Sequence, residues 1–179
     1  MVDDEFSDLL DAGYIQVQRQ YPPEEASFHM CFGCSPTNPI GLKMRFFGKP
    51  GDPEVITRYA IGDNYCGFPN YAHGGIIALL FDEVLAYASY HVLHQFGVTK
   101  TMSVQYYRPV TLNDVHFLHA RVVETKDRPG KGKEVIIEAS LHEGASPDDA
   151  KCAEATGSYV MIPEERVRQS FAKKQKYPN

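Results

Sequence analysis

The longest hydrophobic stretch lies at the centre of the chain, over residues 74–94. A helix that is apolar on all sides is buried inside a protein rather than laid on its surface. The pattern therefore predicts a long, buried central helix, in which Asp82 and Glu83 are the only formal charges. Its apolar positions are Ile76, Ile77, Leu79, Leu80, Phe81, Val84, Leu85, Tyr87, Val92 and Leu93.

Around this helix the hydrophobic period changes to two, which is typical of strands. Strands are expected at residues 42–46 and 55–59 before the helix, joined by a turn at 48–53. Four more are expected after it, at 99–108, 115–124, 133–142 and 152–161. Short turns between the last four predict an antiparallel meander. The fold class is therefore α+β, with a curled antiparallel sheet wrapped around the central helix.

The two ends of the chain differ from this domain. Residues 3–12 predict a short helix, and residues 20–40 are rich in proline and glycine. We expect an N-terminal helix and loop extension over 1–40, a folded domain over 41–163, and a basic tail, with a short helix, over 164–179.

Charge and cysteine content narrow the function classes. The net charge is −5, which gives no general signal for nucleic acid, and the basic tail is most simply a solvated terminus. No run reaches the roughly 18 uninterrupted apolar residues of a membrane span, and residues 1–15 lack the pattern of a signal peptide. Four unevenly spaced cysteines do not make a disulfide framework. These features predict a cytoplasmic protein that binds neither membrane nor nucleic acid.

The candidate active site begins at His73-Gly74-Gly75, where a loop enters the central helix. The first N–H groups of a helix lack internal partners, and the helix dipole makes that end positive. Such a turn can hold a carbonyl oxygen that gains negative charge during acyl transfer. Taken alone, the two glycines are better explained by close packing of the helix on the sheet.

Asp82 strengthens the catalytic interpretation. A carboxylate in a helix that is otherwise apolar is costly unless it is paired, hydrated or functional. Small residues on the same face leave room beside it. Glu83 points about 100° away and is expected to be a solvated or interface charge. Gly75 and Asp82 lie about 10 Å apart along one helix, so a reaction that uses both must draw them from two chains.

The segment His73-Gly74-Gly75-Ile76-Ile77-Ala78-Leu79-Leu80-Phe81-Asp82-Glu83, followed by Ala86-Tyr87-Ala88, resembles the core motif of hot-dog-fold thioesterases of the PaaI type. Thr99, Tyr106 and Arg108-Pro109 are also similar. The resemblance covers about residues 28–162. It implies that residues 41–163 are a hot-dog thioesterase domain that acts on acyl-CoA as a homodimer or homotetramer.

The resemblance also implies roles for individual residues. An amide of Gly74 or Gly75 polarises the thioester carbonyl, while Asp82 from the facing subunit attacks it or activates a water. His73 shapes the turn, and Thr99 occupies a polar position of the pocket. Cys66 stands where many relatives carry Asn or Gln, so the polar contact made there is in question.

A metal site is the weaker alternative for the N-terminal loop. His29, Cys31 and Cys34 are three possible zinc ligands, with Cys66 as a remote fourth. No second pair of ligands follows, so small buried sulfurs in a turn are favoured, with no metal and no cofactor.

Two other functions compete with hydrolysis. A hot-dog protein that binds acyl-CoA without hydrolysing it is the main alternative, although such a protein has no need of Asp82. A hydratase on the same fold is expected to use an Asp/His pair, and the nearest histidines that follow Asp82 are His91 and His94.

Overall fold

The computed structural model describes residues 4–20, 29–130 and 132–174. Within them, a sheet of seven strands has the order β1-β2-β3-β7-β8-β9-β6, with every paired neighbour antiparallel. Its strands are β1 (Ile15–Gln16), β2 (Phe47–Gly48), β3 (Glu54–Ala60), β6 (Gly97–Tyr106), β7 (Val115–Arg128), β8 (Gly132–Glu143) and β9 (Lys151–Met161). The helices are α1 (Ser7–Asp11), α2 (Gly74–Leu93) and α3 (Glu164–Lys174), and a small hairpin joins β4 (Cys66–Phe68) to β5 (Tyr71–Ala72).

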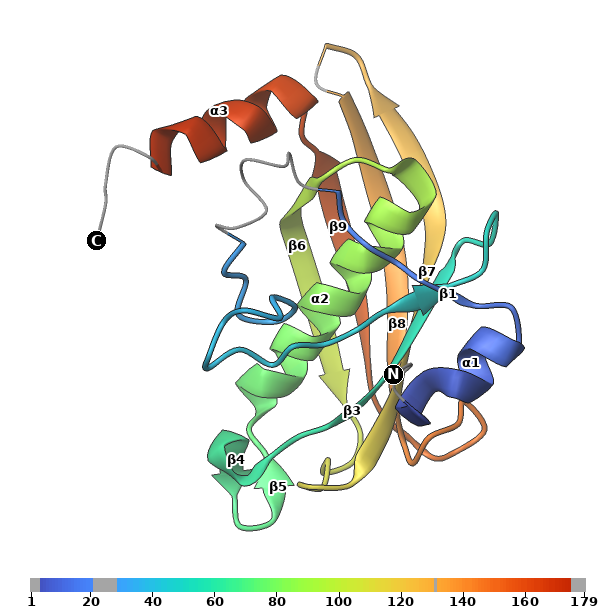
Figure 1. The fold of residues 1–179 in the computed structure, drawn as a ribbon. Coiled ribbons are helices and arrows are strands. Elements are labelled where there is room, and N and C mark those ends of the chain that lie inside the picture. Colours follow the sequence, from blue (N-terminus) through green and yellow to red (C-terminus); the bar gives the residue numbers. More distant parts are fainter. Residues whose placement is uncertain (1–3, 21–28, 131, 175–179) are drawn as a thin grey trace.

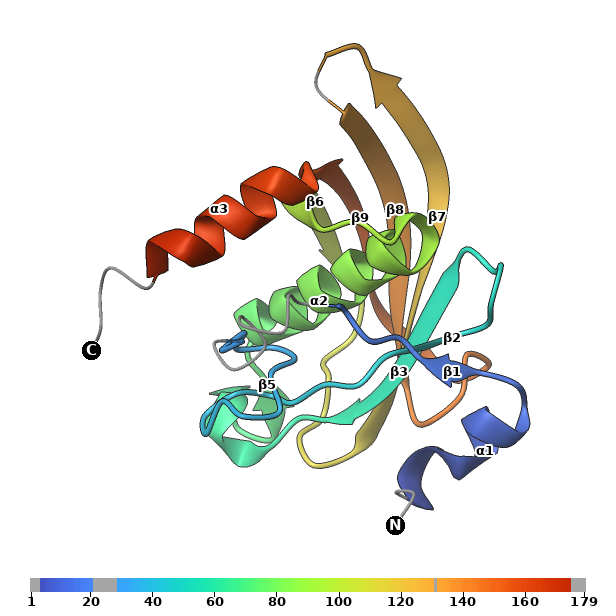
Figure 2. The ribbon, with the colours of Figure 1, turned by 45° about the horizontal axis from the view of Figure 1, so that its top comes forward.

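Helix α2 lies along the inner face of the curved sheet (Figures 1 and 2). Its residues Leu80, Phe81, Val84 and Leu85 are fully buried, and they join inward side chains of the strands in one core. The helix ends where His94 adopts a left-handed conformation, with φ of 50°. The predicted central helix and the fold class are confirmed. Helix α2 is long and apolar enough to cross a membrane by length and composition, but its apolar surface forms this core.

The predicted meander of four strands is wrong in one respect. Strands β7, β8 and β9 pair in sequence order, whereas β6 pairs with β9 and lies at the edge of the sheet. The connection from β6 therefore crosses to the far side of the meander, where β7 pairs with β3. Alternation identifies a strand but does not reveal its neighbour.

The strand predicted at residues 42–46 is also wrong. In this segment strand pairing begins only at Phe47, the first residue of β2. Strand β2 pairs with β1, a strand that the sequence did not predict. Lys43 has a φ of 56°, a left-handed conformation that interrupts an extended strand. Leu42 and Met44 instead donate backbone hydrogen bonds to Phe32 and Gly33 of the preceding loop.

The terminal helices lie outside the main core. Phe6 and Leu9 of the N-terminal helical segment pack with Phe47, Ile56 and Phe117 in a second, smaller cluster. Helix α3 confirms the short helix predicted after Pro163, and it extends away from the sheet (Figure 1).

Because α2 is enclosed by the sheet, we expect Leu85→Ala to destabilise the protein strongly. Leu85 is fully buried, so we expect its truncation to lower the free energy of unfolding by about 2–5 kcal/mol, measured by urea denaturation. Val123→Ala is the matched control, because Val123 is 47% exposed and should cost no more than about 0.5 kcal/mol. Equal losses in the two variants would contradict this account of the core.

Candidate active site

His73 caps helix α2 with its own side chain. Its Nδ1 accepts a hydrogen bond of 2.9 Å from the N–H of Gly75. The His73 N–H in turn donates to the Tyr65 carbonyl at 2.8 Å. The turn is therefore fixed from both sides, in keeping with the shaping role that the family resemblance assigns to His73. Because the imidazole already accepts from the Gly75 amide, that amide is not open to a ligand in this arrangement.

The Gly74 amide is the better placed donor of the turn. It has no hydrogen-bond partner among the described residues, and Gly74 is exposed at the start of the helix. The hydroxyl of Tyr106, on β6, donates to the Gly74 carbonyl at 2.9 Å and holds the turn against the edge strand. A free N–H at the positive end of a helix is suited to a developing oxyanion.

Gly67 is a residue of the site that the sequence interpretation missed. A Cβ atom at Gly67 would lie 2.6 Å from the Cα of His73, which is closer than real side chains come. Strand β4 can therefore pass beside the turn only because residue 67 is glycine. Gly67 is one of several loop glycines, and nothing in a single sequence indicates that this one packs against His73.

The Asp82 carboxylate is half-buried on α2 and is held by two hydroxyl groups. Thr99 Oγ1, from β6, donates to Oδ1 at 2.6 Å. The hydroxyl of Tyr159, from β9, donates to the same oxygen at 2.7 Å and lies 2.9 Å from the Asp82 carbonyl oxygen. The second oxygen, Oδ2, has no hydrogen-bond partner within the described parts of the chain. The carboxylate is thus oriented at one oxygen and available at the other.

Tyr159 is the second residue that the sequence interpretation missed. It is 1% exposed, and burial together with the nearby charge of Asp82 raises its pKa well above the usual range. The phenol therefore remains a hydrogen-bond donor to the carboxylate. In the sequence Tyr159 is one of many aromatic residues in alternating strands, and only the fold brings it to Asp82.

The predicted site residues form two groups rather than one. His73, Gly74 and Gly75 lie at the start of α2, and Cys66 lies close by on the β4–β5 hairpin. Asp82 and Thr99 form the other group, at the middle of the helix. Asp82 is seven positions after Gly75 on one continuous helix, a rise of about 10 Å. Cys66 is exposed, and its thiol donates to the Phe68 carbonyl of its own hairpin at 3.1 Å.

Glu83 corrects another expectation. Predicted as a solvated or interface charge, it is only 7% exposed, and it is more buried than Asp82. Its side chain lies beneath the loop that carries Cys31, whose thiol donates to Glu83 Oε1 at 3.0 Å. Burial of the carboxyl group raises the pKa of Glu83 to about 7. Neighbouring side chains on a helix point about 100° apart, but this angle does not say whether Asp82 or Glu83 points toward the protein interior.

Comparison with known proteins gives three relatives in fungi. The uncharacterised protein C26H8.11c of Schizosaccharomyces pombe is 27% identical over 117 residues, 64% of this chain and 63% of that protein. An uncharacterised mitochondrial protein of Candida albicans is 30% identical over 89 residues, 49% of this chain and 38% of that one. MIOREX complex component 3 of Saccharomyces cerevisiae is 29% identical over 91 residues, 50% of this chain and 32% of that one. The chain spans less than two thirds of the length of each relative.

These relatives contradict the cytoplasmic location predicted from the composition. The Candida albicans protein is named as mitochondrial. Neither the cysteine count nor the charge pattern of the chain distinguishes one cellular compartment from another. The prediction of a cytoplasmic protein is therefore wrong.

Solved structures share the fold. The thioesterase superfamily protein RHA08564 is 24% identical, with a TM-score of 0.62 over 73% of this chain and 62% of that one. The protein smu.793 of Streptococcus mutans, solved with acetyl-CoA bound, is 20% identical, with a TM-score of 0.54 over 62% of this chain and 82% of that one. A family model described as the thioesterase superfamily matches residues 69–131, which include the whole of α2 with His73 and Asp82. The sequence resemblance is thus confirmed: residues 69–131 match the thioesterase superfamily model, and the chain has the hot-dog fold.

Proposed function

We propose that this protein hydrolyses an acyl-CoA, or a related acyl thioester, to the free acid and the thiol at a site shared between two subunits. The observation that carries the proposal is the Asp82 carboxylate, oriented at Oδ1 by Thr99 and Tyr159 and unpartnered at Oδ2 within the described residues. A carboxylate with a purely structural role would be expected to use both oxygens. The match to the thioesterase superfamily supports the same chemistry.

The reaction needs a base or nucleophile and a donor for the oxyanion. As a base, Asp82 Oδ2 takes a proton from water while the water oxygen bonds to the thioester carbon. As a nucleophile, Oδ2 bonds to that carbon directly, and water later hydrolyses the acyl–enzyme anhydride. In both routes the carbonyl oxygen becomes negative and accepts from the Gly74 amide, until the C–S bond breaks and the thiolate leaves.

One helix cannot supply both groups to one carbonyl. The Gly74 amide lies about 12 Å along the axis from Asp82, because Asp82 is eight positions further along α2. An acyl carbon must lie close to its base or nucleophile and to the oxyanion donor at once. The proposed site therefore joins the turn of one protomer to the Asp82 of another.

Strand β6 is the surface on which we place the second subunit. It is the long edge strand of the sheet, and its side chains are mostly exposed or half-buried in the single chain. Val98 is 52% exposed and Tyr106 is 49% exposed, and Thr99 of the same strand binds Asp82. A long open edge with apolar side chains is suited to pairing with another strand, and a two-fold axis makes the same patch meet itself. Two such dimers would associate to form the homotetramer that the family resemblance implies.

A mitochondrial location is proposed in place of the cytoplasmic one. It rests on the name of the Candida albicans relative, which the chain matches over residues that amount to 49% of its length. Acyl thioesters as a class are compatible with that compartment, so the proposed chemistry does not depend on this point.

Asp82→Asn should lower the turnover of thiol release at least about 100-fold for whichever acyl-CoA of a panel the wild type hydrolyses. The amide keeps the shape of the side chain but cannot act as a base or nucleophile. Asp52→Asn, in an exposed turn, is the matched control and should retain wild-type activity. Wild-type turnover in Asp82→Asn would remove this residue from the mechanism. A wild type that binds acyl-CoAs but releases no thiol would favour the non-catalytic binding protein.

The wild type should have a mass in solution of at least twice the 20.1 kDa of the chain, measured by light scattering. Val98→Lys on β6 should shift it toward the monomer, because two like charges would meet across the proposed interface. Val123→Lys, a similarly exposed position on β7, should leave the mass unchanged. A monomeric wild type at assay concentrations would refute the shared site.

A further inference from the structure

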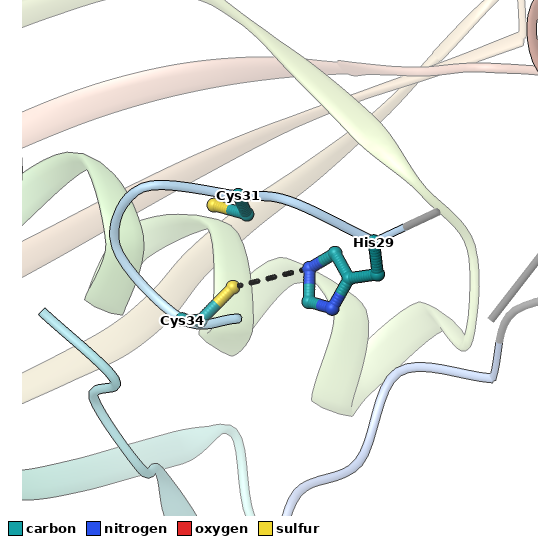
Figure 3. A group of neighbouring side chains, drawn as sticks. All are labelled: His29, Cys31 and Cys34. Carbon is teal, nitrogen blue, oxygen red and sulfur yellow. Dashed lines mark hydrogen bonds between the residues drawn. The ribbon is translucent and has the colours of Figure 1, made fainter. Parts of the chain in front are cut away.

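Three side chains that ligate metals in other proteins converge on the loop before β2. His29, Cys31 and Cys34 lie together above α2 (Figure 3). Their possible ligand atoms all lie within 4.8 Å of one another, and Cys34 Sγ is 3.7 Å from His29 Nε2. Cys34 is buried, while the other two side chains are half-buried. The cluster is thus partly shielded from solvent and closely spaced, unlike a chance group of surface residues.

Glu83 brings a carboxylate from α2 to the Cys31 side of this group. Its Oε1 is 3.0 Å from Cys31 Sγ, but its Oε2 is buried without a hydrogen-bond partner among the residues described. A buried carboxylate oxygen without a hydrogen-bond partner is costly, because it has lost the hydrogen bonds that water would supply. A cation beside Cys31 and Cys34 would supply the missing partner.

The loop is shaped to bring its backbone against Glu83. A Cβ atom at Gly33 would overlap the Glu83 side chain, so only glycine permits this approach. The Ser35 hydroxyl donates to the His29 carbonyl at 2.6 Å and holds the start of the loop beside the two cysteines. Asn38 Nδ2 donates to the Met30 carbonyl at 3.2 Å, and its Oδ1 accepts from the N–H of Ile40. Hydrogen bonds of the loop itself thus position His29, Cys31 and Cys34.

We propose that His29 Nε2, the sulfurs of Cys31 and Cys34, and the Glu83 carboxylate bind one zinc ion. In a tetrahedral site with Zn–S of about 2.3 Å and Zn–N of about 2.05 Å, sulfur and nitrogen lie about 3.6 Å apart. The observed 3.7 Å between Cys34 and His29 agrees with this spacing. Two thiolates, an imidazole and a carboxylate suit zinc better than the hard cations magnesium and calcium, which prefer oxygen ligands.

Four protein ligands leave no open position, which is typical of a structural zinc rather than a catalytic one. The ion would tie the N-terminal loop to the middle of α2, one residue after Asp82. The proposal does not rest on the hydrolase function. The sequence argued against a metal site because no second pair of ligands follows the two cysteines. The proposed fourth ligand, Glu83, lies on a helix 49 residues beyond Cys34, so the spacing of the cysteines does not reveal it.

The first test is the metal content and spectrum of the wild-type chain, prepared without a polyhistidine tag and under reducing conditions. We expect about one zinc per chain by elemental analysis. Cobalt(II) added to the chelated protein should give the visible absorption bands of a tetrahedral cobalt–thiolate site. A folded wild type that takes up neither zinc nor cobalt would overturn the proposal. A Cys31–Cys34 disulfide found by mass spectrometry, in protein kept reduced and exposed to zinc, would also overturn the proposal.

The second test assigns the ligands. Cys34→Ser and Glu83→Gln should each weaken cobalt binding at least about tenfold in competition with a chelator, because each removes a metal bond. Cys66→Ser and Glu143→Gln, both at exposed positions, should bind cobalt as the wild type does. Unchanged affinity in folded Glu83→Gln would refute the four-ligand site. Should a variant fail to fold, the cobalt titration of the wild type still decides whether the site exists.

Discussion

Helix α2 is apolar on almost every side, so the protein must enclose it, and the rest of the structure depends on that constraint. The curved sheet lies against the helix (Figure 2), and Leu80, Phe81, Val84 and Leu85 are fully buried in the core between them. Any polar group on such a helix needs a partner, because lost hydration is not otherwise compensated. The adjacent acids Asp82 and Glu83 sit at this position, and each is met by side chains from a different direction.

The two carboxylates have different surroundings for a geometric reason. Neighbouring helix positions point about 100° apart, so Asp82 meets β6 and β9 while Glu83 meets the loop that precedes β2. Hydroxyl donors at Asp82 keep the carboxylate oriented at one oxygen and leave the other without a partner among the described residues. The Glu83 carboxylate instead accepts a hydrogen bond from the Cys31 thiol, which lies in the group that also contains His29 and Cys34. One turn of a buried helix can therefore serve a reaction on one face and hold a loop on the other.

The sequence predicted those features that depend on local periodicity or on the family motif. Helix α2 was predicted within one residue of its end, because few other arrangements can accommodate so apolar a run. The position of β6 at the sheet edge was missed, since alternation carries no information about pairing partners. Tyr159 and Gly67 were missed for a related reason, because only tertiary packing brings them to Asp82 and His73. Lys43 interrupts its predicted strand through a backbone conformation that its residue type does not reveal.

The most direct test of the shared site mixes two inactive variants, Asp82→Asn and Gly75→Val. A Cβ atom at residue 75 would lie 3.1 Å from His73 Nδ1, so valine should disturb the turn. After random subunit exchange half of the dimers are mixed, and each mixed dimer has one intact site, so about a quarter of all sites should recover activity. If both variants are folded, exchange is demonstrated and the mixture stays inactive, the turn and Asp82 do not act together across two chains.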